Sequence, residues 1–175
     1  YKSKIIILIR NPNDVAFSLK KKGWYRYKYI KEKKNYVIGY QGVATNAHNK
    51  HHNFTRLSPK GEFFYKWNEF NQLVKIKWYW HTIYSQIFRD LNTVPKNHYR
   101  ILRIEDLNYD KYLELSEWIG VKPKINRFFF NMRIKIAKEN KLKKNPKDLK
   151  ILSKFKSSIE KNYYKENLKL SIKND

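Results

Sequence analysis

The sequence predicts an α/β fold with a parallel sheet, and two observations carry that prediction. Residues 4–9, KIIILI, contain five consecutive Ile and Leu residues after Lys4, a run of the kind found in strands that are buried on both faces. The turn-forming residues Asn-Pro-Asn follow at positions 11–13 and lead directly into a short amphipathic pattern. A strand, a tight turn and a helix in this order belong to α/β architecture.

The helix after this turn is expected to begin near Pro12, whose fixed φ suits a first helical turn. Asp14 would then lie near the positive end of the helix dipole. Val15 and Leu19 stand one turn apart, so we expect both to pack on the sheet. The candidate N-cap residues are Asn11 and Asn13.

Residues 20–60 show no clear hydrophobic period, and we expect them to form a lid or an acceptor-side insertion. From Phe64 to about Leu91 apolar residues recur at three- and four-residue steps, which predicts one long helix. The aromatic residues at these steps are most simply core residues. They include Trp67, Phe70, Trp78 and Phe88.

A second strand is predicted at His98–Leu107, ending at Glu105 and Asp106. The segment DKYLELSEWIG at residues 110–120 then predicts an amphipathic helix that stops at Gly120. The basic residues 134–144 are expected to form a loop. A last helix is expected to begin at Pro146 and to run to about Leu170.

The 175 residues are enough for a single domain, 1–175, and they carry a formal net charge of +24. A field this positive attracts anionic ligands, but charge alone does not choose among nucleic acid, acidic glycan and a phosphorylated cofactor. No apolar run approaches the length needed to cross a bilayer. Cysteine is absent, which excludes disulfides and thiolate metal sites and fits a reducing compartment.

The junction between the first strand and its helix carries the first candidate site. Arg10 ends the strand, and the carboxyl edge of a parallel sheet is where α/β proteins bind ligands. A guanidinium offers forked donors that suit a phosphate dianion, and the unpaired N–H groups of the next helix attract phosphate too. Ser18 lies eight residues after Arg10 and can point back at the same anion if the turn is tight. Together they predict a phosphate clamp, although a strand-end Arg can also be a surface ion-pair partner.

Three motifs resemble the sulfotransferases that use 3′-phosphoadenosine 5′-phosphosulfate (PAPS). The segment IIILIRNPNDVAFS is similar to their 3′-phosphate-binding segment, which places its Arg and Ser on Arg10 and Ser18. KWYWHTIYSQI resembles their tryptophan-containing helix, and YRILRIEDLNYDKYLELSEWIGV resembles the strand and helix that follow. The tail from residue 131 onward resembles more loosely the closing loop and helix of carbohydrate-type and bacterial members. The likeness covers nearly the whole chain.

The resemblance implies a P-loop NTPase-like three-layer domain with a parallel sheet, in which PAPS is the cosubstrate and no metal is needed. The family's phosphosulfate-binding strand, loop and helix, with its catalytic Lys, has no counterpart here. We therefore expect a domain incomplete at its N-terminus, with the catalytic groups upstream of Tyr1. Ile104 replaces the Tyr that contacts adenine in cytosolic members. The family's Arg-Lys-Gly phosphate clip is also absent, and its candidate substitutes are Arg133, Lys135 and Lys138.

The expected reaction is transfer of a sulfuryl group from PAPS to a hydroxyl or amine. The looser likeness of the tail favours a carbohydrate or lipid acceptor, and nucleic acid is not expected as a partner. The cytoplasm would suit a bacterial protein. The Golgi lumen would suit a eukaryotic one whose missing N-terminus carries an anchor.

The alternative function is a basic binding module without catalysis, for nucleic acid or an acidic glycan. Residues 24–36, WYRYKYIKEKKNY, interleave aromatic and basic side chains as a stacking surface would, but the same stretch suits a lid facing an anionic glycan. A relative of P-loop kinases is the third alternative and the least favoured, because the sequence contains no phosphate-binding loop of the G-x-x-x-x-G-K-[ST] type.

Several other polar residues are candidates with a simpler structural explanation. His48, His51 and His52 could bind a transition metal, although no carboxylate follows at ligand spacing and a solvated loop is expected. His81 could line an acceptor pocket, but we expect a histidine packed on its helix. Glu105 and Asp106 could form an acid/base pair. The resemblance instead implies that they orient neighbouring elements, with Arg103 as a possible ionic partner.

Overall fold

The computed structural model describes residues 3–32, 40–44, 56–139 and 144–155, together with Glu160 and Tyr164. These residues form two compact units. The first unit comprises residues 1–11 and 88–143, and the second comprises residues 12–87 and 144–175. The boundaries between the units fall directly before a helix that starts at Pro12, inside the helix Gln72–Leu91, and shortly before a helix that starts at Pro146.

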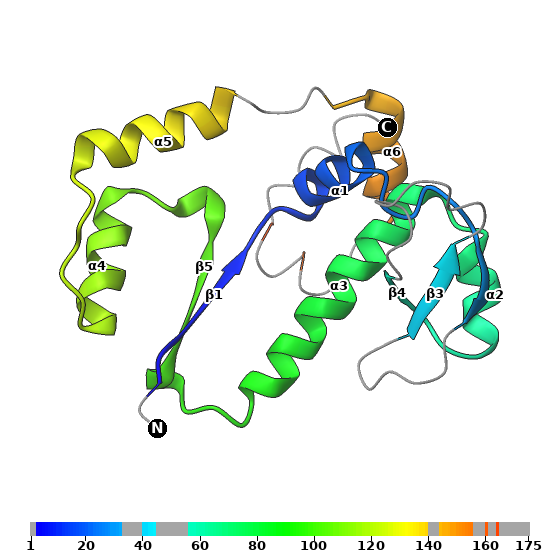
Figure 1. Cartoon of the computed structure of the whole chain (residues 1–175), viewed down its shortest axis with the longest axis horizontal. Coiled ribbons are helices and arrows are strands. Elements are labelled where there is room, and N and C mark those ends of the chain that lie inside the picture. Colours follow the sequence, from blue (N-terminus) through cyan, green and yellow to red (C-terminus); the bar gives the residue numbers. More distant parts are fainter. Residues whose placement is uncertain are drawn as a thin grey trace. The chain divides into compact units, whose positions relative to one another are not determined.

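The first unit contains the parallel sheet (Figure 1). Its elements are β1 (Ile5–Ile9), η2 (Lys96–His98), β5 (Tyr99–Arg103), η3 (Ile104–Asp106), α4 (Tyr109–Ile119) and α5 (Arg127–Glu139). The strands β1 and β5 pair in parallel, with Ile5 opposite Tyr99 and Ile9 opposite Arg103. The predicted mixed α/β class with a parallel sheet is therefore confirmed, as two parallel strands with helices.

The prediction that β1 is buried on both faces is wrong in part. Ile7 and Ile9 are 8% and 0% exposed, as expected for inward-facing residues of a strand. Ile5 and Leu8, however, are 40% and 47% exposed. Among the described residues the sheet has two strands, so each strand has a neighbour on one side and the sheet offers little surface for complete cover.

Helix α4 begins and ends where its sequence requires. The Asn108 side chain accepts a hydrogen bond of 2.8 Å from the backbone N–H of Lys111, which caps the first turn. Gly120 adopts the left-handed conformation, with φ 78°, and its N–H bonds to the carbonyl of Glu117. The predicted stop of the helix at Gly120 is confirmed. Glycine suits this position because a residue with a side chain would be strained at this φ.

Residues 134–139 belong to helix α5, so the loop predicted for this stretch is wrong over these positions. Phe130 on α5 stacks on Tyr112 of α4, with ring centroids 5.4 Å apart, and meets Tyr109 edge-on at 5.7 Å. Lysine and arginine are good helix formers, and this aromatic contact packs the helix on α4.

The second unit contains an antiparallel sheet that the sequence did not predict. Its strands are β2 (Tyr29–Glu32), β3 (Tyr40–Ala44) and β4 (Arg56–Ser58), in the order β2–β3–β4. All three lie within the stretch expected to be irregular. A register shift between Tyr29 and Lys31 interrupts the alternation of β2, and β4 has only three residues, so neither strand shows a clear period of two.

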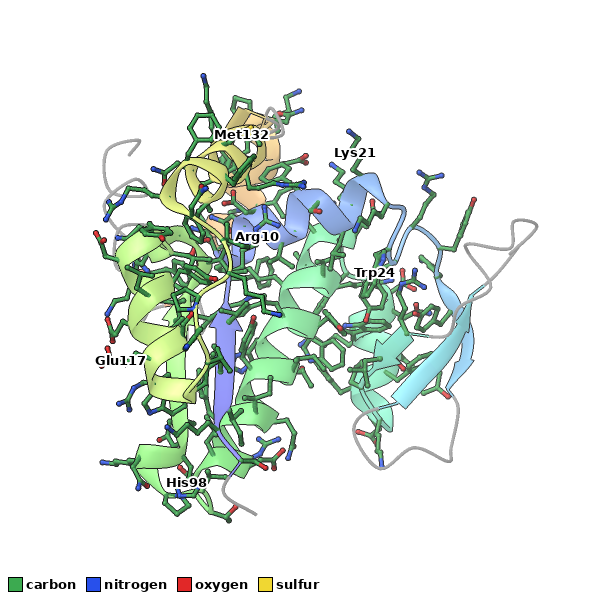
Figure 2. All side chains as sticks on the ribbon, turned by 60° about the vertical axis from the view of Figure 1, so that its left-hand side comes forward. Arg10, Lys21, Trp24, His98, Glu117 and Met132 are labelled. Carbon is green, nitrogen blue, oxygen red and sulfur yellow. The ribbon has the colours of Figure 1, made fainter. Side chains whose placement is uncertain are left out.

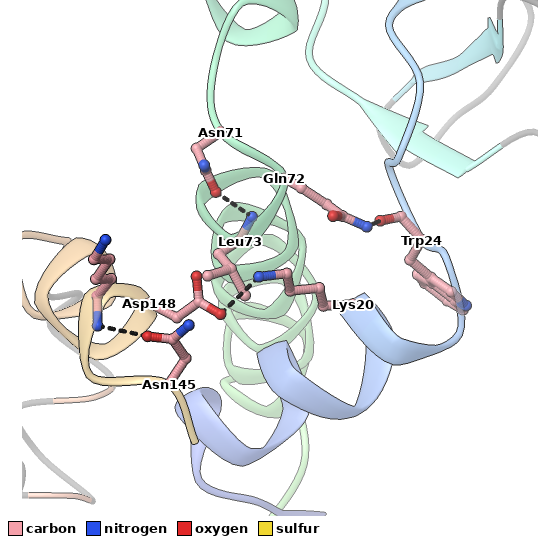
Figure 3. Close-up of polar contacts among 8 residues, drawn as sticks. Lys20, Trp24, Asn71, Gln72, Leu73, Asn145 and Asp148 are labelled. Atoms are coloured by element: carbon pink, nitrogen blue, oxygen red, sulfur yellow. Dashed lines mark hydrogen bonds and ion pairs between the residues drawn. The ribbon is translucent and has the colours of Figure 1, made fainter. Parts of the chain in front are cut away.

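The helices of the second unit are α1 (Pro12–Lys21), α2 (Glu62–Asn68), α3 (Gln72–Leu91, whose last residues enter the first unit) and α6 (Pro146–Ser153). The single long helix predicted from Phe64 is thus two helices. The side chain of Asn71 accepts a hydrogen bond of 2.9 Å from the N–H of Leu73 and starts α3 afresh (Figure 3). The apolar period continues across this break, which is why the pattern alone did not reveal it.

Helix α1 begins at Pro12 as predicted, but its buried residues are Pro12, Ala16 and Phe17, whereas Val15 and Leu19 are half-buried. Two ion pairs connect α1 to the start of α6. Lys20 Nζ lies 2.6 Å from an oxygen of Asp148 (Figure 3), and Lys144 Nζ lies 2.5 Å from an oxygen of Asp14. Helix α6 ends at Ser153, well before the predicted Leu170, which lies outside the described residues.

The core of the second unit is aromatic. Trp67 is 0% exposed, and its ring lies within 5.4–5.6 Å of the ring centroids of Tyr25, Tyr29 and Trp78. Phe64 stacks on it at 6.2 Å. The prediction that Trp67 is a core residue is confirmed, and Trp78, at half burial, contributes to the same cluster.

Candidate functional site

The carboxyl edge of the β1–β5 sheet carries the basic residue on which the phosphate-clamp prediction depends. Arg10 directly follows Ile9, the last residue of β1, and its side chain is exposed (Figure 2). Arg103 is the last residue of β5 and lies opposite Ile9 in the strand register. Two arginines therefore occur at the same end of neighbouring parallel strands, which is the edge where α/β proteins bind ligands.

Arg103 is engaged in an ion pair at this edge. Its Nε and one terminal nitrogen donate to the two carboxylate oxygens of Asp106, each at 2.8 Å. This bidentate contact confirms the predicted ionic partnership of Arg103 with Asp106. Asp106 is thereby oriented within the turn η3.

Glu105 fixes the turn that follows Arg10. One of its carboxylate oxygens accepts a hydrogen bond of 2.7 Å from the backbone N–H of Asn11. A side chain at the end of β5 thus holds the backbone just beyond the end of β1, and this contact sets where the chain turns after Arg10. The contact agrees with the orienting role that the resemblance implies for Glu105.

Ser18 lies in the other unit of the chain, on α1. It is half-buried, and its backbone carbonyl accepts a hydrogen bond of 3.2 Å from the N–H of Lys22. Helix α1 closes with a pair of hydrogen bonds, from Gly23 to Lys20 at 2.9 Å and from Trp24 to Leu19 at 3.0 Å, around a glycine with φ 77°. Because Arg10 and Ser18 belong to different units, their convergence on one phosphate stays a prediction.

The candidate substitutes for the phosphate clip lie on α5. Arg133 and Lys135 are exposed on this helix. Lys138 is also a residue of α5, and its side chain lies outside the described residues. Ile104, at the position where cytosolic sulfotransferases have a Tyr, is 40% exposed and directly follows β5.

The remaining candidates have structural explanations or fall outside the described residues. A ring nitrogen of His81 lies 3.4 Å from the hydroxyl oxygen of Ser85, one turn further along α3, as expected for a histidine packed on its helix. No group of three His, Asp or Glu side chains suited to a metal occurs in the described part of the chain. His48, His51 and His52 lie outside that part.

Two aromatic residues of the aromatic-basic stretch at residues 24–36 belong to the core, whereas Arg26 and Lys28 are exposed. Tyr25 and Tyr29 are 4% and 6% exposed, and the hydroxyl of Tyr25 donates to the carbonyl of Leu57 at 2.5 Å. Burial raises the pKa of both phenols. Trp24 is half-buried and faces the guanidinium of Arg56, 4.2 Å from its ring centroid. Two of the rings that a stacking platform would need are therefore enclosed by protein.

Sequence reasoning missed a buried amine in the second unit. Lys75 is 3% exposed, and its Nζ lies 5.0 Å from the ring centroid of Trp67 and 3.4 Å from the amide oxygen of Asn68. Burial lowers the pKa of Lys75 to about 8, against a smaller opposing effect of the carboxylate of Glu69. The signal available in the sequence is that Lys75 stands between the apolar residues Val74 and Ile76 within the predicted helix.

No protein-family model, characterised protein or solved structure matches the chain. Within the described residues, no helix combines the length and the apolar character that crossing a bilayer requires.

Proposed function

We propose that the chain is the part of a PAPS-dependent sulfotransferase that binds the 3′-phosphate of the cofactor. The single observation that carries this proposal is the segment from Ile5 to Ser18, whose sequence resembles the family's 3′-phosphate motif. The position of Arg10, exposed at the carboxyl end of a parallel strand, supports it. The tie between Glu105 and the N–H of Asn11 supports it further, because a fixed turn limits where the Arg10 side chain can reach.

In this proposal Arg10 and Ser18 bind and do not react. Arg10 supplies forked, charged donors to the 3′-phosphate, and the Ser18 hydroxyl supplies one more hydrogen bond. Anchoring the nucleotide end of PAPS would position its sulfuryl group for in-line transfer to an acceptor hydroxyl or amine, with charge developing on the leaving phosphate oxygen. No segment of these 175 residues resembles the phosphosulfate loop, so we assign no catalytic residue. A carbohydrate or lipid acceptor is part of the proposal.

Calorimetric titration with adenosine 3′,5′-bisphosphate, the desulfated product, tests this assignment. Arg10→Ala should weaken binding by about 2–3 kcal/mol, because it removes a charge-assisted contact. Ser18→Ala should cost about 1 kcal/mol. Arg26→Ala is the matched control, since Arg26 is also an exposed arginine but belongs to the second unit. An affinity that Arg10→Ala leaves unchanged, or that Arg26→Ala lowers as much, would refute the assignment.

The alternative of a basic binding module has lost part of its support. Tyr25 and Tyr29, two aromatics of its proposed stacking surface, are buried, which leaves the net charge of +24 as its main argument. Salt-dependent binding of single-stranded DNA together with no response to the bisphosphate nucleotide would favour it over the sulfotransferase proposal.

A further inference from the structure

Helix α5 presents large apolar side chains to solvent on the side that does not contact α4. Phe128, Phe129 and Met132 are 71%, 54% and 39% exposed, although aromatic residues are rarely left this open. Met132 follows Phe128 by four residues and Phe129 by three, which places the three side chains together on one stripe of the helix. Phe130 occupies the opposite side and packs on α4, so the exposed stripe is not the helix's tertiary contact.

Exposed cations accompany this stripe. Arg133 and Lys135 are exposed on the same helix, and Lys122 and Lys124 are exposed in the loop that precedes it. Two further apolar residues of that loop, Val121 and Ile125, are 52% and 46% exposed. From residue 118 to residue 138 the sequence contains six Lys or Arg residues and no Asp or Glu.

We propose that this surface, hereafter the α5 face, binds the surface of an anionic lipid bilayer. The α5 face consists of Val121, Ile125, Phe128, Phe129 and Met132 with the flanking cations Lys122, Lys124, Arg133 and Lys135. A helix with exposed phenylalanines on one stripe and basic residues beside it is suited to lie in the plane of a membrane, with its rings among the acyl chains and its cations at the lipid phosphates. Anionic lipid supplies the complementary charge.

Two other occupants fit the surface less well. In a symmetric dimer the α5 faces of two copies would contact each other. Each face carries several cations and no carboxylate, so the two faces would repel each other. A polyanion such as nucleic acid or an acidic glycan would pair with the cations, but it would leave three large apolar side chains in water. A bilayer satisfies both halves of the α5 face, and this binding does not depend on the proposed sulfotransferase activity.

Co-sedimentation of the 175-residue chain with vesicles tests the proposal. The vesicles contain phosphatidylcholine alone or with about 30% phosphatidylserine, at near-physiological salt. The chain is expected to bind the anionic vesicles, and its binding to the neutral vesicles should be at least about tenfold weaker. Arg10→Ala should leave vesicle binding unchanged although it should weaken nucleotide binding, which separates this test from that of the proposed function.

The variants separate insertion of the apolar stripe from general attraction by a basic protein. Phe128→Ser with Phe129→Ser should weaken binding roughly tenfold or more at unchanged charge, whereas Tyr65→Ser, a 69% exposed ring on α2, should change it less than about twofold. Arg133→Gln with Lys135→Gln should weaken it roughly tenfold, while Lys150→Gln with Lys154→Gln, exposed in the second unit, should have little effect. Circular dichroism checks that each variant stays folded.

Three results would overturn the proposal. The first is anionic-vesicle binding that survives the double phenylalanine change. The second is an equal loss of binding from the Lys150 and Lys154 changes, which would indicate attraction by overall charge. The third is a dimer in sedimentation velocity that the double phenylalanine change dissociates, which would make a second copy the occupant of the α5 face.

Discussion

The two units of the chain differ in whether the described residues include buried lysines. In the first unit Lys122 and Lys124 are exposed to solvent. In the second unit two lysines of α3 are inside, since Lys75 is 3% exposed and Lys77 is 4% exposed. The same residue type is therefore a solvated surface group in one unit and a costly buried group in the other. The comparison teaches that a net charge of +24 describes the sequence but not the role of any one lysine.

The largest loss of stability is expected from a mutation in the aromatic core of the second unit. Trp67→Ala should lower the free energy of unfolding by about 3–5 kcal/mol, because a fully buried ring leaves a cavity among Tyr25, Tyr29 and Trp78. Denaturant unfolding followed by tryptophan emission measures this. Trp24, Trp78 and Trp80 remain as reporters of the second unit.

The control for this change is Tyr65→Ala, which removes a 69% exposed ring from the same helix, α2. It should alter stability by less than about 0.5 kcal/mol. If Trp67→Ala cost no more than Tyr65→Ala, the described core would not be the stabilising part of this unit.

The buried ion pair Lys77–Glu160 gives the next effect. Lys77 Nζ lies 2.8 Å and 3.1 Å from the two oxygens of Glu160, and it also donates to the carbonyl of Leu152 at 2.8 Å. Lys77→Met should cost about 3 kcal/mol in unfolding free energy, because it leaves a buried carboxylate without its cation.

A double-mutant cycle tests whether this loss comes from the unpaired charge. Lys77→Met combined with Glu160→Leu should recover most of the stability, to within about 1 kcal/mol of the unmodified chain, since two apolar groups then replace a desolvated pair. Losses from the two single changes that simply add in the double variant would show that the two groups do not depend on each other.

The buried Lys75 should make the stability of the second unit depend on pH. Its pKa is about 8 in the folded chain and 10.5 when unfolded, so between these values the unfolded chain binds one proton more. Stability should therefore rise from pH 8 towards pH 10. We expect a gain on the order of 2 kcal/mol over this range. Above pH 10 the buried tyrosines, whose pKa values are raised, oppose any further gain.

Chemical unfolding at pH 7, 8, 9 and 10 measures this dependence. Lys75→Met should remove the rise and should stabilise the chain at pH 7, because it deletes an amine that must be desolvated when charged. Lys66→Met is the control, being an exposed lysine of α2 that should leave the pH profile unchanged. A rise that persists in Lys75→Met would assign the titration to another group.

What the sequence predicted correctly was local. The strand at residues 4–9, the start of α1 at Pro12 and the stop of α4 at Gly120 all follow from single residues or short runs whose effect does not depend on distant contacts. The position of Arg10 at a strand end belongs to the same class. It could be predicted because one side chain after a strand necessarily lies at the edge of the sheet.

What the sequence did not predict depends on distant contacts. Strands β2 and β4 are held by pairing with β3, and their own patterns are too short or too shifted to show it. Helix α5 depends on Phe130 stacking against Tyr112, a contact from outside the helix. The burial of Lys75 is set by Trp67 and Asn68, which precede it across a helix break. Tertiary context overrides local pattern in each case.

The smallest predicted effect lies at the sheet edge of the first unit. Glu105→Ala removes the acceptor of the Asn11 N–H, and because this contact is exposed it should lower local stability by only about 1 kcal/mol. The sensitive readout is amide exchange of Asn11 itself, which should accelerate roughly fivefold. Glu105→Gln is the matched control, since its amide oxygen can still accept the bond and should preserve most of the protection. If both variants exchanged at the unmodified rate, Glu105 would not be holding the turn after Arg10, and the fixed reach on which the proposed phosphate contact depends would lose its physical basis.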